Sequence, residues 1–107
     1  MKLHLEINGK NYYLGEFHQR HCAKTFERLS ELIEVTLKAS KVDFHSHKLR
    51  MKNVQSVLFM SDKLHIKLLC NNSDYEFKSI DVSEKPLDEI VPKLIDKWIK
   101  QVTNDDK

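Results

Sequence analysis

The chain has 107 residues, of which 40% are hydrophobic and 32% are charged, with a formal net charge of +2. This size and composition suit one domain spanning residues 1–107, and the small net charge by itself predicts no polyanionic partner. No segment approaches the roughly 18 to 20 uncharged apolar residues that a membrane span requires, and the chain starts with an alternating pattern in place of a signal peptide's apolar run. We therefore expect a cytoplasmic protein with no membrane partner.

Glycine is scarce in this sequence, which contains only Gly9 and Gly15. Phosphate-binding loops, nucleophile elbows and dinucleotide-binding turns need glycine where the backbone closely approaches a ligand. The commonest enzyme motifs are therefore missing, so we expect a non-enzymatic protein without a cofactor.

The first element is a strand, because Leu3, Leu5 and Ile7 alternate with polar residues. Asn8-Gly9 follows, and this dipeptide favours a type I′ hairpin turn, since both central residues must take positive φ. We expect residues 11–15 to return as the second strand of a hairpin.

An amphipathic helix is expected from about residue 18 to residue 39, where the apolar period changes to three and four. Neither proline nor glycine interrupts this segment. Its apolar stripe should cover one face of a sheet; it consists of Cys22, Phe26, Leu29, Ile33 and Leu37.

Residues 41–82 are expected to form a β-meander. Strand-forming residues dominate 57–60, 64–70 and 75–82, and turn sequences separate these segments, which predicts two consecutive hairpins. The strand boundaries within 41–56 stay open.

The last element is a helix that begins near Pro86 or Leu87. Pro92 lies inside its pattern, which predicts either a kink or a start nearer Val91. The whole chain thus predicts an α+β domain in the order β-β-α-β-β-β-α. An antiparallel sheet, made of the N-terminal hairpin and the meander, is covered by two helices.

Cysteine and histidine supply one alternative site. Cys22 and Cys70 each lie in an apolar segment, and we expect both to be buried free thiols. His18, with His21 and Cys22 on the same helical face, could nevertheless join His45 and His47 of a strand in a tetrahedral zinc site. The spacing matches no standard zinc motif, so a protein without bound metal is favoured.

A basic segment supplies a second alternative. Lys48, Arg50 and Lys52 alternate with apolar residues and would form a row on one face of a strand, extended by Lys63 and Lys67. Such a row could contact a nucleic-acid backbone or a protein partner. Lysines on a sheet edge also prevent unwanted strand pairing, which makes a solvated basic edge the other interpretation.

Residues 1–35 carry a family resemblance. The opening Met1-Lys2-Leu3, the Ile7-Asn8-Gly9-Lys10 turn and the amphipathic run that follows resemble small phage tail assembly chaperones of low-GC Gram-positive bacteria. Those proteins continue mainly as helices, whereas here a meander is expected. The resemblance implies a phage or mobile-element protein that binds another protein, as an assembly chaperone or as an inhibitor of a host protein.

These observations favour a protein-binding module that acts through its surface or by strand addition at a sheet edge. A nucleic-acid-binding protein and a zinc-binding protein are the alternatives. The identity of the partner is left open, and so is homodimerisation.

Overall fold

The computed structural model describes residues 1–51, 54–72, 80–82 and 86–104. The elements are β1 (Lys2–Ile7), β2 (Lys10–Glu16), α1 (Gln19–Ala39), β3 (His45–Met51), β4 (Val54–Met60), β5 (His65–Asn71), β6 (Ile80–Asp81) and α2 (Leu87–Asn104). The five longer strands and the two helices follow the predicted order, and the α+β fold is confirmed. No helix in the described part of the chain is long and apolar enough to cross a membrane.

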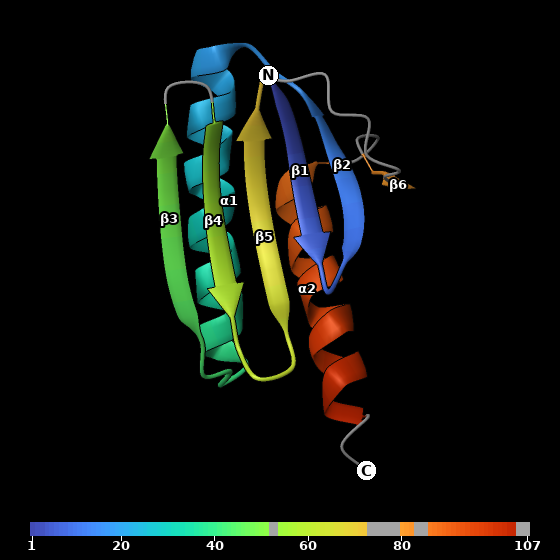
Figure 1. The fold of residues 1–107 in the computed structure, drawn as a ribbon. Helices are drawn as coiled ribbons and strands as arrows, with labels where there is room; N and C mark the ends of the chain where they lie inside the picture. Colours follow the sequence, from blue (N-terminus) through green and yellow to red (C-terminus); the bar gives the residue numbers. More distant parts are fainter. Residues whose placement is uncertain (52–53, 73–79, 83–85, 105–107) are drawn as a thin grey trace.

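The sheet has the strand order β3-β4-β5-β1-β2-β6. Strands β1 to β5 pair antiparallel, and the β1–β5 pairing joins the N-terminal hairpin to the meander. Both helices lie behind the sheet in Figure 1, α1 behind β4 and α2 behind β1, with the end of α2 extending past the β1–β2 turn. The helices therefore cover one face of the sheet, and no described helix covers the opposite face, here called the open face.

The β1–β2 turn has the expected chemistry. Asn8 and Gly9 take φ values of 49° and 85°, as a type I′ turn requires. The Asn8 Oδ1 accepts a hydrogen bond from the His65 backbone N at 2.7 Å, and its Nδ2 donates to the Lys63 carbonyl at 3.1 Å. This side chain therefore ties the first hairpin turn to the β4–β5 turn.

One hydrophobic core lies between the helices and the sheet. Alternation along β1 and β5 directs Leu3, Leu5 and Leu68 into it, and each is essentially fully buried. Trp98 of α2 packs against this core and donates from Nε1 to the Tyr12 hydroxyl at 3.1 Å. The further core residues from the two helices are Cys22, Phe26, Leu29, Ile33, Leu37, Val91 and Ile95.

Two local expectations are corrected. The expected 75–82 strand is described only at β6, which pairs in parallel with β2 and does not form a hairpin with β5; residues 75–79 lie outside the described residues. A third hairpin strand has no place beside β5, because β4 and β1 already occupy both its edges. For α2, the expected start near Leu87 is confirmed and the alternative start nearer Val91 is wrong, since the helix begins at Leu87 and continues through Pro92.

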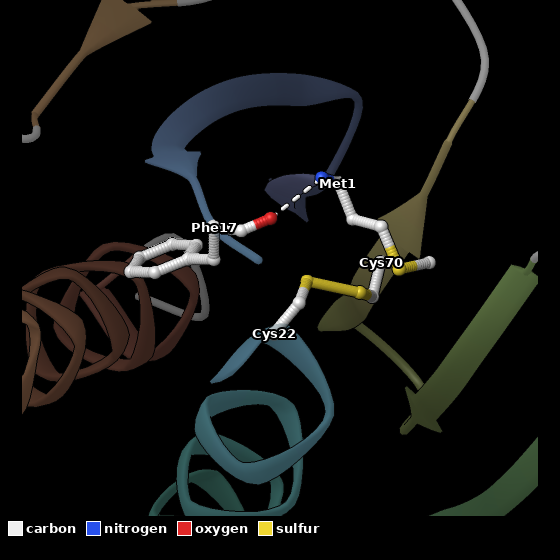
Figure 2. The surroundings of a disulfide bond; sticks show 4 residues. All are labelled: Met1, Phe17, Cys22 and Cys70. Carbon is white, nitrogen blue, oxygen red and sulfur yellow. Dashed lines mark hydrogen bonds between the residues drawn. A yellow bond between two sulfur atoms is a disulfide. The ribbon is translucent and has the colours of Figure 1, made fainter. Parts of the chain in front are cut away.

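The expectation of free thiols is wrong as well, because Cys22 and Cys70 form a disulfide (Figure 2). Cys22 lies in the first turn of α1 on its buried stripe, and Cys70 lies near the end of β5 on the helix-covered face. Both cysteines lie in the interface between α1 and the sheet, so packing of the helix against the sheet brings them together. Beside them, the Met1 ammonium donates to the Phe17 carbonyl at 2.6 Å and holds the start of β1 against the segment that leads into α1.

Candidate binding edge and open face

Strand β3 forms one edge of the sheet. In the described part of the chain its only strand partner is β4, and all seven of its residues are exposed. An edge strand carries backbone N–H and C=O groups that no neighbouring strand pairs. The β3 pairing with β4 is regular from His45 to Met51, so this edge is a continuous and straightforward template for another strand.

The register divides the side chains of β3 between two faces. Lys48 lies opposite the buried Val57, and Arg50 lies opposite Gln55, which puts both bases on the helix-covered side. His45, His47, Leu49 and Met51 consequently lie on the open face. β3 contains no acidic residue, so its edge carries only neutral and positive side chains.

The open face next to β3 carries exposed apolar side chains. Leu49, Met51 and Met60 are 47%, 61% and 45% exposed. Cross-strand pairing places Leu49 beside Ser56, and Ser56 beside Leu69. The face near β3 is therefore an apolar surface bordered by histidines, and it lies next to the unpaired edge.

His4 lies in the same cross-strand row, between Leu69 and Tyr13. Its ring centroid is 5.3 Å from that of Tyr13, and the residue is only 7% exposed. Burial lowers the pKa of His4 below its ordinary value of 6.5, and the positive charge of Lys2 lowers it further. The neutral form of His4 is thus favoured at the centre of this face.

The expected basic row keeps Lys48 and Arg50 on one face of β3, but its expected extension to Lys67 is wrong. Lys48 and Arg50 lie on the helix-covered side of β3, whereas Lys67 pairs with Leu58 and Glu6 on the open face. Lys63 lies in the turn between β4 and β5, and Lys52 lies outside the described residues. Among the bases that the structure describes, Lys48 and Arg50 are therefore the pair that shares one strand face.

The histidine alternative is not assembled either. His18 and His21 lie at the start of α1, whereas His45 and His47 lie at the start of β3, which follows the far end of that helix. Cys22 is bonded to Cys70 and is not available as a thiolate ligand. Among the described residues, no group of three or more His, Cys, Asp or Glu side chains could hold a metal ion.

Sequence reasoning missed two features near this edge. The Cys22–Cys70 pairing had a signal, since both residues occupy core positions of elements that must pack together. No sequence signal indicated that Arg50 and Arg20 line one cavity, because this depends on where α1 crosses the sheet.

Comparison with known proteins adds no family assignment. The chain matches no protein-family model, and neither the curated proteins nor the solved structures give a match.

Proposed function

We propose that this protein is a small non-enzymatic module that binds another protein by accepting an extended segment of it at β3. The observation that carries the proposal is the seven-residue edge, fully exposed and paired only with β4 in the described part of the chain. Strand addition at such an edge supplies main-chain hydrogen bonds, and alternate side chains supply specificity.

The side chains of β3 specify the chemistry of the partner. Lys48 and Arg50 would lie beside partner residues on the helix-covered side, where acidic side chains form favourable cross-strand pairs. Leu49 and Met51 would lie beside partner residues on the open face, where apolar side chains would cover them. The segment that fits alternates acidic and apolar residues.

A second copy of the chain fits β3 poorly. In an antiparallel two-fold pairing centred on the middle of β3, Lys48 of one copy lies opposite Lys48 of the other. Shifting the pairing to centre on Leu49 instead brings Lys48 opposite Arg50. Like charges directly opposite one another are destabilising, so the charge pattern favours an acidic partner over a β3-mediated homodimer.

Nucleic-acid binding is the alternative from another class. A row of bases supports phosphate contacts, but of the described bases in the expected row, Lys48 and Arg50 alone share a face and strand. Lys67 lies on the opposite face. Because these bases lie on two different faces of the sheet, a protein partner is favoured over nucleic acid.

The test is selection of decapeptides from a random library on the folded protein, followed by calorimetry and amide hydrogen exchange with the selected peptide. We expect enrichment of alternating acidic and apolar sequences, and slower exchange at β3 amides in the complex. The variant Lys48→Glu should weaken binding of an acidic peptide, whereas Lys24→Glu on the exposed side of α1 should not.

Two results would contradict strand addition. One is selected peptides that bind without protecting β3 amides. The other is tight binding of single-stranded DNA that falls steeply with salt and is lost in Lys48→Glu, which would favour the nucleic-acid alternative.

The finer assignments stay predictions. An origin in a phage or mobile element, and a role as assembly chaperone or host inhibitor, depend on the resemblance of residues 1–35. Cytoplasmic location is in tension with the disulfide, because reducing compartments keep such cysteines as thiols. Alkylation of thiols in intact cells, followed by mass analysis, would show whether the protein resides in a compartment that reduces this disulfide.

A further inference from the structure

A cavity of about 360 Å³ lies where the start of α1 passes over the ends of β3, β4 and β5. On the sheet side, the register places Arg50, Gln55 and Cys70 in one cross-strand row on the helix-covered face. On the helix side, α1 contributes Gln19, Arg20 and Ala23. The remaining lining residues are Met1, Met51 and Val54.

The described lining of this cavity contains two arginines and no acidic side chain. Arg20 and Arg50 come from different elements, yet both line the same space, and its described lining residues include no Asp or Glu. Within the described residues the ion pairs are Arg28–Asp88 and Lys38–Glu34, so neither cavity arginine is neutralised in this way. Two arginines that line one cavity raise its affinity for an anion.

The start of α1 adds to this potential. Its first turn contains no acidic residue, and His18 at the N-cap makes no side-chain capping hydrogen bond. The first turn thus has no acidic side chain of its own to offset the positive end of the helix dipole, which favours an anion there. The dipole strengthens a site that the two arginines define.

The rest of the lining indicates what the anion is attached to. Met1 and Ala23 add apolar surface, Met51 and Val54 line the cavity where β3 ends and β4 begins, and Gln19 and Gln55 supply amide groups. Cavities of this size that combine an apolar lining with a few polar groups are typical of ligand sites. Guanidinium groups bind carboxylates through paired hydrogen bonds.

We propose that this cavity, called the arginine cavity, binds a carboxylate carried by an apolar group. Two sources carry this chemistry: a free amphipathic acid, and the C-terminal carboxylate of a protein segment that ends in an apolar residue. Because Arg50 and Met51 end β3, a segment added parallel to β3 would bring its C-terminus to this end of the sheet. The proposal does not depend on strand addition, since a free acid would bind in the same way.

The test is an NMR titration of the ¹⁵N-labelled protein with octanoate, with octanamide as the neutral control. We expect saturable shifts at the amides of Gln19, Arg20, Arg50 and Gln55 with octanoate, and weak ones with octanamide. Arg20→Gln and Arg50→Gln should each weaken octanoate binding by about tenfold or more, because each removes a charged hydrogen-bond donor. Lys24→Gln, an exposed position of α1 that does not line the cavity, should bind as the wild type does.

Short peptides ending in leucine then separate the two sources. Binding of the free-acid form but not of its C-terminal amide supports a protein segment, and binding of octanoate alone supports a free acid. Equal affinity for octanoate and octanamide would overturn the proposal, since an apolar cavity alone would explain it. So would wild-type affinity in both arginine variants, once their dispersed spectra show that they are folded.

Failure here is distinguishable from failure of the proposed function. Lys48→Glu changes the β3 edge without changing a lining residue of the cavity, and Arg20→Gln changes the cavity without changing β3. If peptide binding is weakened by Lys48→Glu but not by Arg20→Gln, strand addition at β3 is supported. The arginine cavity then does not contribute to peptide binding.

Discussion

Reduction of the Cys22–Cys70 disulfide is expected to cost this protein a large share of its stability. The bond joins the first turn of α1 to the end of β5, across a sequence separation of 48 residues. Both cysteines are essentially fully buried, so the crosslink lies within the core. In the unfolded chain, the same bond restricts a long loop whose freedom reduction would restore.

The magnitude follows from the loop length. With 48 residues in the closed loop, the chain-entropy relation gives about 4 kcal/mol of stabilisation at 25 °C. Domains are typically stable by about 5 to 15 kcal/mol, so this loss leaves a small one marginal. Divided by a urea m-value of about 1 to 3 kcal/mol/M, it lowers the unfolding midpoint by about 1.3 to 4 M.

The assay is urea unfolding, followed by far-UV circular dichroism, with and without a phosphine reductant. The wild-type midpoint should fall on reduction, because both thiols then stay in place and only the crosslink is lost. The double variant Cys22→Ala/Cys70→Ala is the control, and its midpoint should not respond to reductant. Equal midpoints for oxidised and reduced wild type would refute the reasoning, as would alkylation of both cysteines in the purified, unreduced and unfolded protein.

Three further predictions concern single side chains. Because burial lowers the pKa of His4, the unfolded state takes up a proton first as pH falls below 6.5; stability measured by urea unfolding should decline there, and the variant His4→Phe should show a shallower decline. Trp98→Phe and Tyr12→Phe should couple by about 0.5 to 1.5 kcal/mol in a double-mutant cycle, and additive losses would exclude the hydrogen bond between them. Asn8→Gly removes two hydrogen bonds and should lower the free energy of unfolding, measured by thermal unfolding, by about 1 to 2 kcal/mol. Asn8→Ala should lower it by about 1 kcal/mol more, because alanine disfavours the positive φ of this position. Equal losses in the two variants would contradict the turn geometry.

The candidate sites were harder to predict from the sequence than the elements were. Lys48 and Arg50 were found because alternation along a strand is a local property, and both are exposed on β3. Lys67 alternates equally well along β5, but the pairing of β4 with β5 places it on the other face. The sequence thus predicts which bases of one strand share a face. Whether bases from different strands share a face depends on the register between the strands.

Local chemistry determined the parts of this protein that involve neighbours in the chain. Asn8-Gly9 specified the first turn because few dipeptides tolerate two positive φ values, and the period of apolar residues specified α1 because no proline or glycine interrupts it. These signals act over a few residues, so they can be read without knowing the fold.

Only the tertiary structure decided what depends on elements meeting. The disulfide between Cys22 and Cys70, the separation of His18 from His45, and the arginine cavity follow from how α1 crosses the sheet. The position of β6 beside β2 follows from β1 and β4 having taken both edges of β5. Such contacts join residues far apart in the chain. They form because the apolar face of a helix packs against the apolar face of the sheet, and no local sequence pattern specifies which residues then meet.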